Sequence, residues 1–291
     1  MIWRFRGREM SFDRTRIMAI LNVTPDSFSD GGEYFSKEDA VRMALQMEKA
    51  GADLIDIGGE STRPGAFPVS PEEEMERTLP VIREIRRKSQ IPLSIDTTKP
   101  EVARAALEAG ADILNDVNGL HAAKEMAAAA REFEAGFILM HRRGNPETMH
   151  EFTQYEDVVE EVFQELDKSF QEVLAAGVSP DQIMLDPGIG FSKNAEQSLE
   201  LLAGLRRFQA WGRPVLVGPS RKSFLGALIG TAVPKSPRER DWGTAAAVAL
   251  TVAAGASMVR VHNVEAMRDV VCVAEAIVRI GSPLKGLHVR S

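Results

Sequence analysis

The sequence of 291 residues predicts an α/β protein with the (β/α)8 barrel fold. Short apolar segments suited to buried strands alternate with segments of helical spacing along almost the whole chain. The tripeptide Ala-Gly-Ala recurs at 50–52, 109–111 and 254–256, each time after a predicted helix and before a predicted strand. The eight predicted strands are 17–21, 54–57, 93–95, 113–116, 137–140, 183–185, 215–217 and 258–261. An open, doubly wound parallel sheet is the alternative architecture.

Residues 1–16 alternate apolar and charged side chains around Gly7, which predicts a short N-terminal β-hairpin closing one end of the barrel. We expect the barrel to span residues 17–282 and the chain, 1–291, to form a single domain, because no linker interrupts it. Helices are predicted at 37–50, 100–109 and 158–176, with Thr97 and Thr98 as candidate N-caps of the second. Gly110 is its predicted stop.

The balance of charges argues against a nucleic-acid partner. The chain has 35 Lys and Arg against 42 Asp and Glu, a net charge of −7, which disfavours binding to a polyanion. No apolar run is long enough for a membrane span, and the charged N-terminus does not resemble a signal peptide. The single cysteine, Cys272, lies in an apolar run, which predicts a buried, inert thiol and a cytoplasmic location.

Polar residues follow the predicted strands at their carboxyl ends. Any one of them has an ordinary structural explanation, such as a helix cap, a turn or a satisfied core histidine. Their shared position at strand ends is harder to explain by stability alone, because the carboxyl ends of barrel strands meet at one rim, where catalytic residues gather. The residues concerned include Asn22, Asp56, Asp96, Asn115, Asp116, His141, Asp186, Lys222, Arg260 and His262.

These residues form two chemical groups. Asp96, Asn115, Asp186 and Lys222 suit a flat heterocycle, since a carboxylate accepts the two parallel N–H donors of an amino-pyrimidinone edge. Arginine and histidine after the last strands suit a phosphate group, and the amide oxygen of Asn22 suits Mg²⁺. The loops 22–32 and 58–67 are rich in Gly, Ser, Thr and Pro, as mobile covers of active sites are.

Taken together, the motifs resemble the dihydropteroate synthase family of pterin-binding barrels over residues 17–280. The resemblance rests on the segments Asn22–Gly32 (NVTPDSFSDGG), Gly58–Gly65 (GGESTRPG), Ser94–Thr97, Asn115-Asp116, Met140-His141, Asp186–Phe191 (DPGIGF), Ser220–Lys222 and Arg260–His262. It implies an enzyme of folate biosynthesis. That enzyme condenses 6-hydroxymethyl-7,8-dihydropterin diphosphate with 4-aminobenzoate and releases 7,8-dihydropteroate and pyrophosphate.

The resemblance also implies residue roles. The pterin would be held by Asp96, Asn115, Met140, Asp186, Gly218 and Lys222, and the diphosphate by Asn22, Arg63, Arg260 and His262. The aminobenzoate pocket would comprise Phe28, Ser61, Thr62, Pro64, Phe191 and Ser223. Catalysis would depend on Asp30, Arg63, Lys222, Arg260 and His262, with Mg²⁺ on Asn22 as the cofactor. A homodimer and sensitivity to sulfonamides are expected of the family.

Two other functions use a similar pterin lining. A methyltetrahydrofolate-dependent methyltransferase would not need Thr62, Arg63, Arg260 or His262, and a non-catalytic pterin-binding paralogue should have lost Asn22, Arg63 or Lys222. All of these residues are present. The chain departs from the usual family pattern at Arg142, Arg143, Ser192, Asn194 and Asn263, none of which is a predicted site residue.

Overall fold

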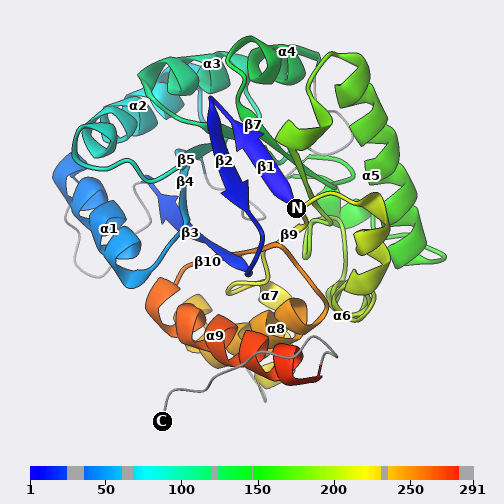
Figure 1. Ribbon diagram of the computed structural model, residues 1–291. Helices are drawn as coiled ribbons and strands as arrows, with labels where there is room; N and C mark the ends of the chain where they lie inside the picture. The colour runs from blue at the N-terminus through cyan, green and yellow to red at the C-terminus, as the bar shows by residue number, and fades with distance from the viewer. Residues whose placement is uncertain (25–35, 61–67, 119–123, 146, 231–234, 282–291) are drawn as a thin grey trace.

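In the computed structural model, the described residues form ten strands, two in a hairpin and eight in a parallel sheet (Figure 1). The structure describes residues 1–24, 36–60, 68–118, 124–145, 147–230 and 235–281. The hairpin strands are β1 (Ile2–Phe5) and β2 (Arg8–Ser11). The sheet contains β3 (Arg16–Asn22), β4 (Leu54–Gly58), β5 (Leu93–Asp96), β6 (Ile113–Asp116), β7 (Gly136–Met140), β8 (Ile183–Asp186), β9 (Leu216–Val217) and β10 (Met258–Val261).

The sheet closes into a barrel. Its strand order is β8-β7-β6-β5-β4-β3-β10-β9, and a parallel bridge between Leu185 and Val215 joins its two ends. Val215 makes this bridge rather than pairing within β9, which is why β9 is one residue shorter than predicted. The predicted (β/α)8 barrel is therefore confirmed, and the open doubly wound sheet is wrong.

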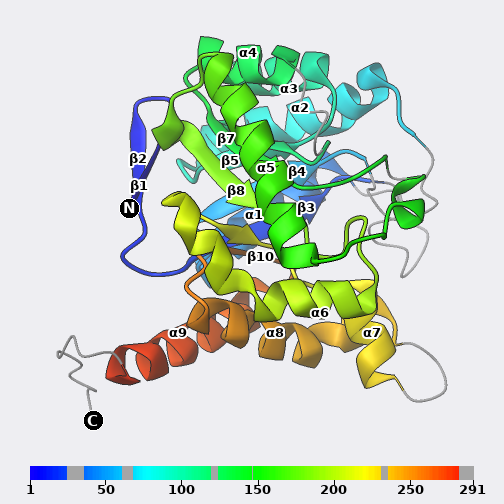
Figure 2. The ribbon, with the colours of Figure 1, turned by 90° about the vertical axis from the view of Figure 1, so that its right-hand side faces the viewer.

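Helices surround the barrel on all sides (Figures 1 and 2). They are α1 (Lys37–Ala50), α2 (Pro71–Lys88), α3 (Pro100–Ala109), α4 (Lys124–Glu132), α5 (Val158–Ala175), α6 (Ala195–Ala203), α7 (Ser223–Ile229), α8 (Asp241–Ala253) and α9 (Val264–Gly281). Short 3-10 helices lie at Met149–Glu151, Pro180–Gln182, Leu205–Trp211 and Pro237–Arg240. The buried apolar faces of the α-helices pack on the outer side chains of the strands and form the main core.

The Ala-Gly-Ala repeats mark the ends of helices. Gly51 and Gly110 adopt φ of 107° and 116° and cap α1 and α3, a conformation that favours glycine. The start of α3 differs from the prediction, because its N-cap is Lys99 and neither Thr97 nor Thr98. The Thr97 hydroxyl instead accepts a hydrogen bond from the Lys99 amide at 3.2 Å, and Pro100 occupies the first helical turn.

The N-terminal hairpin covers one end of the barrel, as predicted (Figure 2). Trp3, Phe5 and Met10 are buried against the inward side chains of the barrel strands, among them Met18 and Met258. The Trp3 indole also donates a hydrogen bond of 2.7 Å to the carbonyl of Gln182. This end of the barrel is therefore filled by apolar side chains.

The prediction that Cys272 is buried is wrong, since its side chain is exposed. Helix α9 buries Val264, Met267, Val271 and Ala274, whose spacing of three and four residues defines one face. Cys272 falls on the opposite face beside exposed Val273. The apolar run around Cys272 led to the wrong prediction because the outer face of α9 is apolar as well.

Candidate functional site

Two carboxylates and one guanidinium form the floor of the site at the carboxyl ends of β4, β5 and β10. Arg260 Nε donates to Asp56 at 2.6 Å, and Arg260 Nη2 donates to Asp96 at 2.7 Å. Asp56 also accepts hydrogen bonds from Ser94 Oγ at 2.6 Å and Asn115 Nδ2 at 3.1 Å. The strand register explains this, because Asp96 pairs with Asn115 while Asp56 pairs with Ser94, one layer deeper.

Burial and neighbouring charges set the ionisation of the floor. Burial raises the pKa of Asp96 to about 7, although Arg260 opposes the rise, and Asp56 adds a second anion nearby. Asp96 Oδ1 is buried and has no hydrogen-bond partner among the described residues. The pKa of Arg260 is raised because Asp56 and Asp96 outweigh its burial. The floor thus holds one fixed cation and a carboxylate with an unoccupied acceptor atom.

The opposite wall comes from β7, β8 and the start of α7. Met140 pairs in register with Asp186, and both side chains are buried. Asp186 Oδ1 accepts a hydrogen bond of 2.7 Å from the Gly188 amide. A turn follows in which Gly188 has φ of 69°, and a Cβ there would lie 2.0 Å from the His141 carbonyl oxygen. Only glycine fits this close approach, so the turn fixes where Asp186 lies.

Lys222 reaches this wall from the N-cap of α7. Its ammonium lies 3.7 Å from the centroid of the Phe191 ring, a cation–π contact. Burial lowers the pKa of Lys222 to about 8, and Arg260 lowers it further, while Asp186 and Asp96 oppose the change. Burial raises the pKa of Asp186. The charges of Asp186, Asp96 and Arg260 all act on Lys222, so the carboxyl-end rim brings together residues of both predicted groups.

The rim beside β9 and β10 contains Gly218, Ser220 and His262. Ser220 Oγ lies 2.9 Å from His262 Nδ1 and accepts from the His262 amide at 3.2 Å. A Cβ on Gly218 would lie in ordinary contact with Arg260 Cβ, at 3.7 Å, so Gly218 lies next to Arg260. Ser223 is exposed at the first position of α7.

Asn22 ends β3 across Gly58 from Asp96. A Cβ on Gly58 would lie 3.7 Å from Asn22 Oδ1 and 4.0 Å from Asp96 Oδ2. Asn22 is half-buried at the carboxyl end of β3. The described residues contain no group of three or more His, Cys, Asp or Glu arranged for a metal ion.

The predicted residues of the two Gly-rich loops lie outside the described part of the chain. They are Phe28, Asp30, Ser61, Thr62, Arg63 and Pro64.

Several residues of the site were not predicted. Asp56 was noted at a strand end but given no role, although it binds Arg260. Asp116, at the end of β6, and Arg142, just after β7, were likewise noted without a role; both are buried, and burial raises the pKa of Asp116 to about 7. Lys193 is buried behind Phe191 and His141. The sequence does contain a signal for Asp56, because a charged residue within an otherwise apolar strand indicates a buried functional group. No comparable sequence pattern marks Lys193.

Three departures from the family pattern have defined contacts. Asn194 caps α6 by accepting from the Gln197 amide at 2.9 Å. Ser192 Oγ accepts from the Arg143 amide at 2.9 Å. Asn263 Nδ2 donates to Asp241 at 3.1 Å. These side chains stabilise loops around the site and do not enter its floor.

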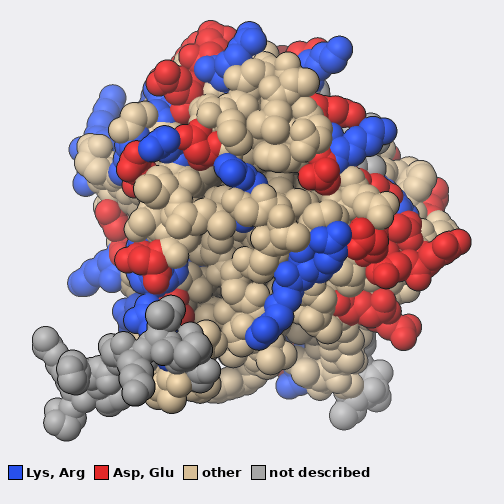
Figure 3. Space-filling view, turned by 45° about the vertical axis from the view of Figure 1, so that its right-hand side comes forward, with Lys and Arg blue, Asp and Glu red and all other residues tan. Residues whose placement is uncertain are grey.

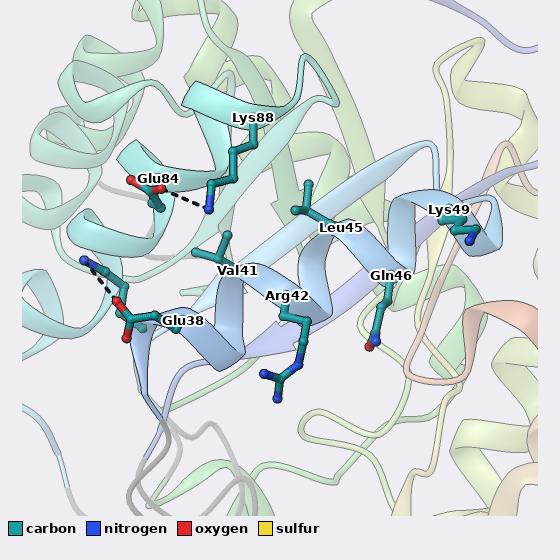
Figure 4. A pocket seen from close by; sticks show the side chains of 9 residues that line it. Glu38, Val41, Arg42, Leu45, Gln46, Lys49, Glu84 and Lys88 are labelled. Atoms are coloured by element: carbon teal, nitrogen blue, oxygen red, sulfur yellow. Dashed lines mark ion pairs between the residues drawn. The ribbon is translucent and has the colours of Figure 1, made fainter.

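A groove of about 450 Å³ lies outside the barrel, between α1 and α2 (Figure 4). Its walls include Val41, Leu45 and Lys49 from α1 and Glu84 and Lys88 from α2. Lys88 pairs with Glu84 at 3.1 Å, so these charges already satisfy each other. The groove is separate from the carboxyl-end rim. Figure 3 shows one face of the molecule, on which basic and acidic side chains are both present.

The fold and the site define a barrel enzyme for a flat, polar heterocycle. A family model described as "Pterin binding enzyme" matches residues 18–262. The chain is 51% identical over 266 residues to dihydropteroate synthase of Synechocystis sp., with 91% of each chain covered. It is 43% identical over 275 residues to dihydropteroate synthase of Escherichia coli, covering 93% of this chain and 94% of the relative. The chain belongs to the dihydropteroate synthase family.

Solved structures agree. A Yersinia pestis dihydropteroate synthase with a sulfonamide drug complex has a TM-score of 0.88 at 38% identity, covering 95% of this chain and 99% of that chain. A Thermus thermophilus dihydropteroate synthase in complex with 4-aminobenzoate has a TM-score of 0.84 at 40% identity, covering 95% and 100%. Within the described residues, no helix is long and apolar enough to cross a membrane.

Proposed function

We propose that this chain condenses 6-hydroxymethyl-7,8-dihydropterin diphosphate with 4-aminobenzoate, giving 7,8-dihydropteroate and pyrophosphate. The observation that carries the proposal is the floor of the site. Asp96 Oδ1 is buried without a hydrogen-bond partner among the described residues, while Asp96 Oδ2 is held by Arg260. A buried acceptor of this kind stabilises a ligand that brings N–H donors, as the edge of a pterin does.

The pterin would lie between the floor and the wall. Asp96 and Asp186 would accept its N–H groups, Asn115 would bind an edge with both donor and acceptor, and Lys222 would donate to a ring carbonyl or nitrogen. Met140 and Gly218 would pack around the ring. The support is that these side chains lie at the carboxyl ends of the barrel strands or just after them, with Lys222 and Arg260 each close enough to affect the pKa of Asp96.

The diphosphate would leave from the pterin methylene as its charge is neutralised. Arg63, Arg260 and His262 would bind it, and Mg²⁺ on Asn22 would supply further charge neutralisation and make it a better leaving group. Support for Asn22 is its half-buried amide oxygen beside Asp96. Arg260 is held by two carboxylates, so it would bind an anion only with atoms not used by Asp56 and Asp96.

The second substrate would enter after the pterin is in place. The carbon–oxygen bond breaks with release of the diphosphate, the pterin ring delocalises the positive charge left on the methylene carbon, and the amine adds to that carbon and then loses a proton. The ring would be held by Phe28, Ser61, Thr62, Pro64, Phe191 and Ser223, with Asp30 near the cationic carbon. An arylamine needs orientation and exclusion of water more than a strong base, which suits a pocket built from apolar and hydroxyl side chains.

Pyrophosphate release tests this function. With Mg²⁺ and the pterin diphosphate present, we expect release that depends on added 4-aminobenzoate and equals the dihydropteroate formed. Removal of Mg²⁺ with a chelator should lower the rate, which tests the metal separately. Folded protein that binds the pterin but releases no pyrophosphate would favour a non-catalytic paralogue. Methyl transfer from methyltetrahydrofolate would favour the methyltransferase.

We also propose that the chain forms a homodimer through α7, α8 and α9, which lie together in Figure 2. The outer face of α8 carries exposed Trp242 and Leu250, and that of α9 carries exposed Val273 and Ile277. Several large exposed apolar side chains on neighbouring helices are typical of subunit interfaces. A second copy is the partner that symmetry favours.

A cytoplasmic location is proposed as well. Its support is the exposed thiol of Cys272, which a reducing compartment would keep reduced. Fractionation of cells that express the tagged chain tests it, and recovery in an extracytoplasmic fraction would contradict it.

A further inference from the structure

A buried lysine behind the proposed aminobenzoate pocket has no part in the function described so far. Lys193 lies between the turn after β8 and the start of α6, with only 7% of its surface exposed. Its Nζ donates to the Phe191 carbonyl oxygen at 2.7 Å and contacts His141 Nδ1 at 2.9 Å. The cluster continues to α5, where Glu165 Oε2 lies 2.9 Å from His141 Nε2. We call these residues the lysine–histidine cluster.

The ionised carboxylate of Glu165 can only accept, so His141 Nε2 carries the ring proton and His141 Nδ1 accepts from Lys193 Nζ. Burial lowers the pKa of Lys193 to about 7, and its amine can donate to Nδ1 whether it is charged or neutral. Burial lowers the pKa of His141 to about 4, so the ring is neutral at neutral pH. Arg143 also forms an ion pair with Glu165. Burial alone would raise the pKa of Glu165, but hydrogen bonds from His141 and Arg143 outweigh burial and lower this pKa to about 2. The imidazole therefore has a fixed tautomer and orientation.

The cluster acts on the turn that presents Phe191. This turn is tight, because Gly188 and Gly190 adopt φ of 69° and 79° and Ser192 adopts φ of 53°. Its middle is closed by a hydrogen bond of 3.0 Å from the Phe191 amide to the Gly188 carbonyl. Lys193 then holds the Phe191 carbonyl, so the backbone of Phe191 is bonded on both sides.

The Phe191 ring in turn meets Lys222. The ring centroid lies 3.7 Å from the Lys222 ammonium, and a Cβ on Gly190 would lie 3.2 Å from Lys222 Cδ. A small change in the turn would therefore move both a wall of the aromatic pocket and a lysine of the pterin site. Burying an ammonium only to fill space is costly, since an apolar side chain would fill it with less desolvation.

We propose that Lys193 is a positioning residue for the second substrate. By bonding the Phe191 carbonyl and the neutral His141 ring, it sets the position of the Phe191 ring over Lys222 and thus the shape of the pocket for the aryl ring of 4-aminobenzoate. This inference rests on the proposed function for the identity of that substrate. Its geometric part, the position of Phe191, does not.

The first test is Lys193→Met, which removes both hydrogen bonds at similar length. We expect the KM for 4-aminobenzoate to rise about tenfold while the KM for the pterin diphosphate changes less than about twofold. The matched control is Lys168→Met, an exposed lysine on α5, which should leave both values unchanged. A purely structural role would lower the fraction of active enzyme, and hence kcat, without separating the two KM values.

A pair of His141 variants separates the two ends of the cluster. His141→Asn keeps an acceptor where Nδ1 faces Lys193, whereas His141→Gln keeps a donor where Nε2 faces Glu165. We expect the glutamine variant to resemble Lys193→Met and the asparagine variant to stay closer to the wild type. If both behave alike, or if both KM values rise together, the proposal is wrong.

A structure of Lys193→Met tests the geometric part independently of activity. We expect the Phe191 ring to move away from the Lys222 ammonium. A ring that stays within the original contact distance would overturn the proposal, whatever the wild-type enzyme does with 4-aminobenzoate. Wild-type enzyme that needs no 4-aminobenzoate for pyrophosphate release would instead overturn the proposed function, leaving the position of Phe191 as a separate result.

Discussion

Asp56 and Asp96 face a single guanidinium in the deepest part of the site, and their arrangement shows what single side chains contribute. Arg260 can reach both carboxylates because a guanidinium presents several donors in a fixed plane. Lysine in the same place would carry the charge without that geometry. The anion-binding and heterocycle-binding roles predicted for separate residues thus depend on one shared cation.

Replacement of Arg260 by lysine tests this dependence. We expect Arg260→Lys to lower kcat/KM at least about tenfold, since one ammonium cannot replace two directed bonds. The free energy of unfolding should fall by about 1–3 kcal/mol, because a buried carboxylate loses its partner. Steady-state assays and urea unfolding give the two values. Unchanged activity would contradict the role of Arg260 in the site.

Asp116 provides a pH-dependent test. Burial raises its pKa to about 7 from 3.8, although the Asn118 amide, which donates to Oδ1 at 2.8 Å, opposes the rise. A carboxyl with a higher pKa in the folded state contributes stability that is complete below about pH 4 and is lost as the pH rises through about 7. Asp116→Asn cannot ionise and keeps the acceptor for Asn118.

We therefore expect the unfolding free energy of Asp116→Asn minus that of the wild type to be at least about 1 kcal/mol larger at pH 8 than at pH 5. Urea unfolding at both pH values measures it. Asp269→Asn, on the exposed surface of α9, is the control and should show a smaller pH-dependent difference. A difference that stays constant with pH would mean that Asp116 does not titrate in this range.

Among the elements, those with strong local patterns were predicted well. Helix α1 has the predicted bounds, and α5 differs from its prediction by one residue, because apolar spacing and terminal glycine or proline residues specify them locally. Local sequence did not predict the contacts between elements. Lys193 and His141 are 52 residues apart in the chain, and no periodic pattern signals that their side chains meet. The N-cap at Lys99 was also missed, because the Thr97 hydroxyl serves the turn before the helix.

The hairpin allows a test at the level of one element. Trp3 is fully buried and also bonds to Gln182, whereas Ile2, its neighbour on β1, is 47% exposed. We expect Trp3→Ala to lower the free energy of unfolding by about 3–5 kcal/mol, because it leaves a cavity at the end of the barrel. Ile2→Ala should cost less than about 0.5 kcal/mol. Equal effects in urea unfolding would show that the hairpin does not close the barrel in solution.

For the whole molecule, the sequence predicted the closed barrel and the gathering of polar side chains at one rim, because both follow from eight repeated units. It did not predict the exposed Cys272, since an apolar run does not say whether a helix faces its own core or another subunit. Helices α8 and α9 carry apolar residues on both faces, which burial in a dimer would explain.

The dimer is tested by changing its proposed interface. We expect the wild type to sediment as a dimer and its Tm to rise with protein concentration, as association requires. Leu250→Lys, on the outer face of α8, should sediment as a monomer with a Tm that does not depend on concentration. Leu199→Lys, exposed on α6, makes the same change of side chain and charge as a control and should remain a dimer. A wild type that sediments as a monomer at all concentrations would contradict the proposal.

The hairpin that fills the amino end of the barrel also limits how molecules travel. Trp3, Phe5 and Met10 block that end of the barrel. Among the described residues, the hairpin therefore makes the carboxyl-end rim the side from which a substrate can reach the floor formed by Asp56, Asp96 and Arg260.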